Sequence, residues 1–163
     1  MVNWIKQREN LTRKDWSLLL TSIIGCNLVG ASPAFFVGSE TDWVEKPWFY
    51  PPEILFPIVW TPLFTLMGIA LFLILRSDQR GATFLQALLA FAIQFGLNLS
   101  WTPIFFGLQR PDLGFVIILL LWIAIVGTIF LFSRISRLAG ALLVPYLLWV
   151  TFATVLNYSI AVA

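Results

Sequence analysis

The sequence predicts an all-α integral membrane protein, built as a bundle of five transmembrane helices. Of its 163 residues, 60% are hydrophobic and only 11% are charged, and the mean hydropathy is +0.90. A soluble domain is nearer half apolar and a quarter charged. The charged residues also fall in clusters, which leave five charge-free runs. About 20 apolar residues cross the hydrocarbon core as a helix, and each of the five runs is long enough.

The expected spans follow from these runs in chain order. The runs cover residues 16–39, 54–75, 81–109, 113–133 and 138–163. Within them we expect helices at about 16–37, 54–75, 83–106, 113–133 and 139–160, in a single membrane domain over residues 1–163. Strands are excluded because a membrane barrel alternates apolar and polar residues, whereas segments such as 117–123 are apolar throughout. Backbone groups in lipid must be satisfied within their own segment, which leaves helices.

Basic residues determine the predicted orientation. The segment before residue 16 and the loops at 76–80 and 134–137 hold eight of the ten Lys and Arg residues, and the opposite side holds only Lys46 and Arg110. In a plasma membrane, the positive-inside rule then places the N-terminus in the cytoplasm and the C-terminus outside.

The residue types that are absent exclude several classes of function. The chain has no histidine and a single cysteine, so we expect no metal site. None of the five runs contains Asp, Glu, Lys or Arg. This disfavours proton-coupled transport and leaves no conventional catalytic site within the spans. We expect no obligatory cofactor and no nucleic-acid partner.

Amide and aromatic side chains are the informative residues of the spans. Gln94, Asn98 and Trp101 share one face of the third span, and Tyr146 and Trp149 share a face of the last. Amides in hydrocarbon need partners and should therefore face the bundle interior. For Asn98, a hydrogen bond between helices and a contact with a ligand are equally good interpretations. For two further amides the interhelical bond is favoured: Asn27 and Asn157.

Prolines and the first loop indicate where a pocket would lie. Five prolines fall within the expected spans, where each favours a kink: Pro33, Pro57, Pro62, Pro103 and Pro145. Three of them lie in the outer half, and kinked helices pack less tightly there. The loop over residues 38–53 is rich in proline and aromatic residues, so it is a candidate lid. An aromatic pocket with a few hydrogen-bond donors suits a flat, apolar, partly polar ligand.

Three ordered motifs resemble those of a known family. The first loop reads Lys-Pro-Trp-Phe-Tyr-Pro-Pro over residues 46–52 and is followed by Pro-Ile-Val-Trp at 57–60. The third span contains Leu-Asn-Leu-Ser-Trp-Thr-Pro-Ile-Phe-Phe-Gly at 97–107, and the fifth contains Val-Pro-Tyr-Leu-Leu-Trp at 144–149. Over about residues 16–160 the chain is thus similar to the translocator protein family, also called tryptophan-rich sensory proteins or peripheral benzodiazepine receptors.

The resemblance implies a five-helix bundle that binds tetrapyrroles such as protoporphyrin IX or haem. It also implies binding of PK11195-type ligands, in a cavity formed below the first loop by spans one, two, three and five. Motif by motif, it assigns pocket roles to five residues: Trp60, Asn98, Trp101, Tyr146 and Trp149. It adds five wall residues: Ala31, Pro47, Phe56, Phe105 and Ala153.

Three functions agree with these expectations. The favoured one is a receptor or sensor that binds porphyrins. The alternatives are a carrier of porphyrins or lipids and an enzyme that degrades protoporphyrin in light. In several bacterial members of the family, such breakdown is attributed to the tryptophans that match Trp60 and Trp149. Light chemistry needs an indole close to the excited porphyrin, but it needs no histidine.

Two further expectations concern the lid and the lipid partners. The family loop usually has a Trp-Tyr pair several residues before Lys-Pro, whereas here only Trp43 lies before Lys46, so the lid is expected to be shorter. Phe49 also replaces the family tryptophan that follows Lys-Pro, with Trp48 beside it. Cholesterol, which animal members bind, is not supported as a ligand. The proposed sterol motif needs Lys or Arg shortly after a tyrosine, and no charged residue follows Arg137.

The family is often dimeric, and we expect a homodimer here. Small residues let transmembrane helices approach closely. Spans one and three carry such residues at Gly25, Gly30, Ala31, Ala92, Gly96 and Ser100. Packing within one monomer is an equally good interpretation of each patch.

Overall fold

The computed structural model describes residues 11–38 and 40–163, and all regular structure in these ranges is helical. Lys6 and Arg8, which enter the predicted orientation, lie outside the described residues. Five segments are long and apolar enough to cross a membrane: Arg13–Val37, Leu55–Arg76, Ala82–Gly107, Pro111–Ile135 and Arg137–Ala161. The predicted fold class, an all-α membrane protein with five spans, is confirmed. The orientation of the termini stays a prediction.

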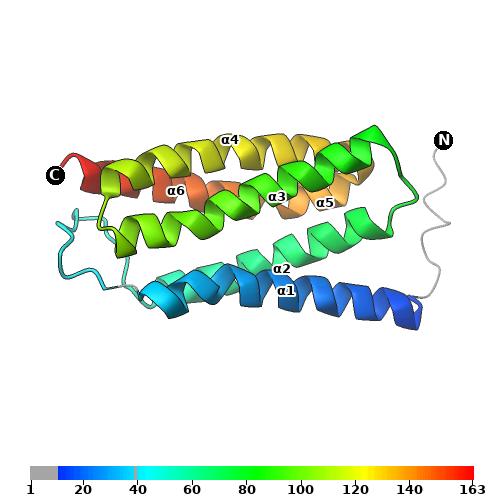
Figure 1. Cartoon of the computed structure of the whole chain (residues 1–163), viewed down its shortest axis with the longest axis horizontal. Helices are drawn as coiled ribbons and strands as arrows, with labels where there is room; N and C mark the ends of the chain where they lie inside the picture. Colours follow the sequence, from blue (N-terminus) through cyan, green and yellow to red (C-terminus); the bar gives the residue numbers. More distant parts are fainter. Residues whose placement is uncertain (1–10, 39) are drawn as a thin grey trace.

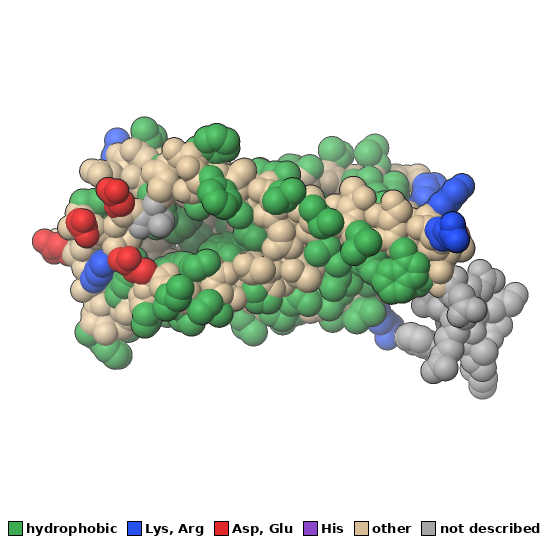
Figure 2. All heavy atoms as spheres, turned by 90° about the horizontal axis from the view of Figure 1, so that it is seen from below, with side chains coloured by type: hydrophobic (Ala, Val, Ile, Leu, Met, Phe, Trp, Pro, Cys, Tyr) green, Lys and Arg blue, Asp and Glu red, His purple; other side chains and the backbone are tan. Residues whose placement is uncertain are grey.

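The helices run side by side along the long axis of the molecule (Figure 1). Helices α1 (Arg13–Val37) and α2 (Leu55–Arg76) form one antiparallel pair. Helix α3 (Ala82–Thr102) packs against α4 (Pro111–Ile135), and α4 packs against α6 (Val144–Ala161). We call the end that carries the α1–α2 connection the loop end, and the end that carries the α2–α3 connection the basic end. Acidic side chains gather at the loop end, and a cluster of basic side chains lies at the basic end (Figure 2).

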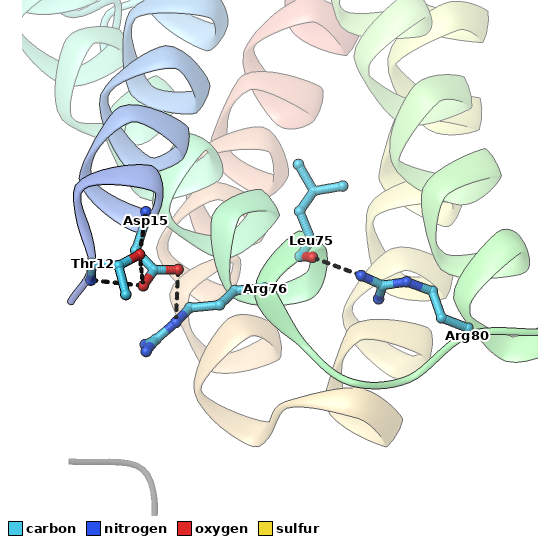
Figure 3. Close-up of polar contacts among 5 residues, drawn as sticks. All are labelled: Thr12, Asp15, Leu75, Arg76 and Arg80. Carbon is cyan, nitrogen blue, oxygen red and sulfur yellow. Dashed lines mark hydrogen bonds and ion pairs between the residues drawn. The ribbon is translucent and has the colours of Figure 1, made fainter. Parts of the chain in front are cut away.

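Helix α1 begins at Arg13, earlier than expected, because a capping box extends it. The Thr12 side chain accepts a hydrogen bond from the Asp15 backbone N–H (3.2 Å), and the Asp15 carboxylate accepts one from the Thr12 backbone N–H (2.9 Å). The same carboxylate lies 3.2 Å from Nε of Arg76 and so ties α1 to α2 (Figure 3). Arg80 donates to the carbonyl groups of Ser77 and Leu75 and thereby covers the end of α2.

Prolines shape three of the helices in different ways. Pro103 begins a π-helical turn, η1 (Pro103–Gly107), which continues α3 to the loop end. Pro145 follows a break at Leu143 that divides the fifth span into α5 (Arg137–Leu142) and α6. The expectation for Pro57 was wrong. It lies in the first turn of α2, where a missing N–H removes no helical hydrogen bond, so it has no reason to kink the helix.

Helices α1 and α2 touch most closely where a glycine replaces a side chain. A Cβ atom added at Gly68 would lie 2.6 Å from Cα of Ile23 and 2.8 Å from the carbonyl oxygen of Ser22. Nearer the loop end, a Cβ atom added at Gly30 would lie 2.5 Å from the ring of Phe64. The backbones of the two helices are therefore in contact at Gly68, whereas nearer the loop end the ring of Phe64 lies between them.

The small residues considered for a dimer lie in different surroundings. Gly30 packs against Phe64 within the monomer, whereas a Cβ atom added at Gly25 or Gly96 would meet no other atom within 4 Å. Ala92 on α3 is exposed beside Gly96. The homodimer stays a prediction, although Gly30 of its span-one patch already packs within the monomer.

Candidate functional site

A cavity of about 290 Å³ lies at the loop end of the bundle. Figure 2 shows a hollow there, beside acidic side chains. Five helices and η1 supply its wall, and the α1–α2 loop covers it through Thr41, Tyr50 and Glu53. Four lining residues are exposed, so the cavity opens between α1 and α2 beside the loop: Ala34 of α1, Glu53 of the loop, and Pro57 and Thr61 of α2. Its volume is at the low end of the range of ligand pockets, roughly 300–1,000 Å³.

Seven of the ten residues predicted for the site line this cavity. They are Ala31, Phe56, Trp60, Asn98, Trp101, Trp149 and Ala153. Tyr146 is fully buried behind the wall, where its ring meets the edge of Trp60 at 6.1 Å between centroids. Phe105 is buried behind Trp101 and stacks on it at 4.9 Å. Pro47 lies in the loop, away from the cavity lining, and its carbonyl accepts a hydrogen bond from Tyr50 N–H at 2.9 Å.

Seven aromatic residues line the cavity, and several of them pack against one another. Trp60 stacks on Phe64 at 5.2 Å between centroids, and Phe56 meets the edge of Trp149 at 6.0 Å. Such pairs contribute about 0.5–1.5 kcal/mol each beyond the area they bury. The wall is therefore a set of rings held in position by their neighbours, and it offers flat apolar surfaces to a ligand.

The amides of α3 form a hydrogen-bonded chain with the last helix. The Nδ2 group of Asn98 donates to the Tyr146 hydroxyl, and that hydroxyl donates to Oε1 of Gln94, both at 3.0 Å. Gln94 is 1% exposed, so its carbonyl would have no water to bond without Tyr146. The bond to Tyr146 confirms the interhelical interpretation of Asn98. Asn98 also lines the cavity, and its contact with a ligand stays a prediction.

The other predicted amides bond between helices, as favoured. Asn157 accepts a hydrogen bond from Nε1 of Trp101 at 2.9 Å and donates to the carbonyl of Pro111 at 2.8 Å. Asn27 donates to the Thr65 hydroxyl at 3.1 Å and to the Ile23 carbonyl in its own helix. The Asn157 bonds fix the orientation of the Trp101 ring on the cavity wall.

The Trp149 indole has the one buried side-chain polar atom without a partner among the described residues. Its Nε1–H group belongs to a residue that lines the cavity. By contrast, the indole N–H of Trp101 bonds to Asn157, and that of Trp122, on the outer surface, bonds to Thr151 at 2.9 Å. An unpaired buried donor is rare in native structures and calls for an explanation such as a ligand acceptor or a water.

A polar cluster lies at the mouth of the cavity, in the loop between α1 and α2. Glu53 accepts hydrogen bonds from the Thr41 hydroxyl and from Nζ of Lys46, the latter at 2.9 Å. These two donors hold the pKa of the Glu53 carboxyl below its usual value. The ties are therefore complete above the ordinary carboxyl pKa and are lost only as the pH falls through the lowered pKa. At neutral pH, Glu53 remains ionised and fastens the loop.

Sequence reasoning missed two parts of the site. Ile118 and Leu121 of α4 line the cavity, although the expected wall excluded the fourth span. They lie in an apolar run whose residues are too uniform to distinguish a cavity face from a lipid face. Thr41 and Glu53 of the loop were also missed. The sequence signal that could have indicated them is the Lys-Pro motif, because Lys46 bonds to Glu53. Among the described residues, no group of acidic and cysteine side chains is placed to hold a metal ion.

Comparison with known proteins places this architecture in a family. The model described as the TspO/MBR family matches residues 22–163. The Tryptophan-rich protein TspO of Chlorobaculum tepidum is 45% identical over 148 residues, which cover 88% of this chain and 94% of that protein. The Tryptophan-rich sensory protein of Cereibacter sphaeroides is 36% identical over 145 residues, covering 88% and 89%. The Translocator protein of Homo sapiens is 33% identical over 147 residues, covering 86% and 84%.

The match begins in the third turn of α1 and includes the loop between α1 and α2 and the other four spans. The cavity, its aromatic wall and its mouth lie entirely within the matched residues. This chain belongs to the TspO/MBR family.

Proposed function

We propose that this protein is a membrane receptor that binds porphyrins of the protoporphyrin IX type, and related flat apolar ligands, in the loop-end cavity. The observation that carries the proposal is the aromatic wall of the cavity, to which Trp60, Trp101 and Trp149 contribute. A tetrapyrrole offers a flat π-surface that suits these rings. PK11195-type ligands would use the same surfaces.

The size of the cavity determines how such a ligand would fit. A substituted tetrapyrrole is larger than 290 Å³, so part of it would extend through the opening between α1 and α2. Ala34 and Thr61 border that opening, and their side chains are small. The ligand would therefore stack inside the bundle and keep one edge at the mouth.

A light-dependent degradation of protoporphyrin is a second candidate, because Trp60 and Trp149 both line the cavity. An excited porphyrin bound there would have an indole ring on the wall at either position. A receptor would bind without turnover in the dark, and an enzyme would bleach the bound porphyrin under light. The double variant Trp60→Phe, Trp149→Phe separates the two, because bleaching as fast as in the wild type contradicts an enzymatic role.

The test of binding is a titration with protoporphyrin IX in the dark, followed by quenching of tryptophan fluorescence. We expect saturable quenching, with the affinity about two- to tenfold weaker in Trp149→Phe, because the smaller ring offers less stacking surface and one aromatic pair is worth about 0.5–1.5 kcal/mol. Trp122→Phe is the matched control. It removes an indole on the outer surface whose N–H already has a partner, so its affinity should equal that of the wild type. Quenching no different from protein-free detergent micelles would contradict the proposal.

A further inference from the structure

The two ends of the bundle carry opposite charges. Among the described residues, the basic end has six Lys and Arg side chains against two carboxylates, a net side-chain charge of +4. The loop end has five carboxylates against two basic side chains, a net side-chain charge of −3. Figure 2 shows the basic cluster at the end of the molecule away from the hollow. The basic end is therefore complementary to negative charge at one face of the bilayer.

The arginines of the basic end differ in what they already bind. Arg76 pairs with Asp15 at 3.2 Å, and Arg80 donates to backbone carbonyl groups at the end of α2 and in the loop that follows. Arg134, in the last turn of α4, and Arg137, the first residue of α5, are both exposed. No carboxylate of the described residues forms an ion pair with either of them. Their guanidinium groups are thus available to a partner outside the described chain.

An aromatic ring holds one of these guanidinium groups at the boundary between lipid and water. The Arg134 guanidinium lies over the ring of Phe130, 5.8 Å from its centroid. Phe130 is 63% exposed on the most apolar of the five spans, so it faces lipid. Arg134 lies one turn further along the same helix, where the charge-free run ends. Its charge is therefore placed on the lipid-facing side, at the depth where headgroups begin.

The break between α4 and α5 brings the second guanidinium to the same corner of the bundle. Helix α5 begins at Arg137 directly after its cap, Ser136, and packs against α2 and α4. Leu138, the next residue, is 59% exposed, so this side of the corner also borders lipid. A guanidinium is weakly hydrated, and its planar set of donors matches the oxygen atoms of a phosphate group. Two such groups at the edge of an apolar surface are suited to a phosphate that carries acyl chains.

We propose that Arg134 and Arg137, at the corner between α4 and α5, bind the phosphate group of an anionic membrane lipid. The acyl chains would lie along the exposed apolar side of α4 that carries Phe130. A zwitterionic lipid offers the same phosphate with a cation of its own, so it would gain less from the positive charge of this end. The inference concerns the end of the bundle opposite the cavity and does not depend on the proposed function.

The test is a titration of the protein in neutral detergent with phosphatidylglycerol and, separately, with phosphatidylcholine that has the same acyl chains. Native mass spectrometry measures how much of each lipid stays bound. For the wild type we expect phosphatidylglycerol to bind roughly tenfold more tightly than phosphatidylcholine. That preference should fall about three- to fivefold in Arg134→Gln and should be lost almost completely in the double variant Arg134→Gln, Arg137→Gln.

Arg110→Gln is the matched control, because it removes the same charge from an exposed arginine at the loop end, where Arg110 pairs with Asp112 at 2.6 Å. Its preference for phosphatidylglycerol should equal that of the wild type. Equal binding of the two lipids by the wild type would overturn the inference. So would a wild-type preference in the double variant, or an equal loss in Arg110→Gln and Arg134→Gln, with each protein shown to be folded by its Tm.

Discussion

Gly68→Ala is expected to lower the free energy of unfolding by about 1–3 kcal/mol, although alanine is the better helix former. The added methyl group would lie 2.6 Å from Cα of Ile23 and 2.8 Å from the carbonyl oxygen of Ser22. Both are backbone atoms, so no side-chain rotation relieves the contact and α1 must move away from α2. Thermal unfolding in detergent should show a lower Tm.

The matched control for this prediction is Gly25→Ala on α1. A Cβ atom there would meet no neighbour within 4 Å, so the substitution should be neutral or stabilise the protein by up to about 1 kcal/mol. Equal effects of Gly68→Ala and Gly25→Ala on Tm would contradict the close contact between α1 and α2.

Asn157→Leu should also destabilise the protein, by about 1–3 kcal/mol, and should disturb the cavity wall. Asn157 is 1% exposed and joins three helices, since it accepts from Nε1 of Trp101 on α3 and donates to the Pro111 carbonyl on α4. Leucine would leave the Trp101 indole N–H unpaired away from water. The measurement is Tm, together with the wavelength of tryptophan emission.

Asn27→Leu is the comparison that isolates this effect. Asn27 donates to the Ile23 carbonyl and to the Thr65 hydroxyl, and Thr65 keeps its own bond to the Thr61 carbonyl when Asn27 is removed. Removing the Asn27 amide should therefore lower the free energy of unfolding by less than about 1 kcal/mol, which agrees with the modest average for hydrogen bonds between membrane helices. An Asn157→Leu protein no less stable than Asn27→Leu would contradict the structural role of Asn157.

The five spans could be predicted because a bilayer imposes a simple requirement on length and charge. A run of about 20 residues without charges reports directly on that requirement. The ends were harder to locate. Helix α1 begins at Arg13 because Thr12 and Asp15 cap it. The first turn of the helix therefore contains charged residues, and a boundary drawn from hydropathy excludes them.

The breaks within spans could not be predicted from proline positions alone. Pro103 and Pro145 coincide with a π-helical turn and with the division of α5 from α6. Pro33 and Pro62, however, lie inside continuous helices. Whether a proline interrupts a helix depends on how neighbouring groups satisfy the freed carbonyl, and this is a property of packing.

The wall of the cavity was largely accessible from sequence because aromatic and amide residues are conspicuous in apolar spans. Trp60, Asn98 and Trp149 lie together as the motifs implied. The contribution of α4 was missed because Ile118 and Leu121 have no chemical feature that separates them from lipid-facing neighbours. The role of Glu53 depends on how the loop folds back over the mouth, which no spacing rule describes.

The most direct test of the central claim is to fill the cavity and measure porphyrin binding. Ala153→Leu adds bulk to a residue of the wall, whereas Ala92→Leu adds the same bulk to an exposed position on α3. If porphyrin occupies this cavity, Ala153→Leu should weaken the binding of protoporphyrin IX in the dark at least about tenfold, the loss of roughly 1.4 kcal/mol. Ala92→Leu should bind as the wild type does. Equal affinities for the two variants, with both proteins folded by Tm, would contradict the claim that the loop-end cavity is the binding site.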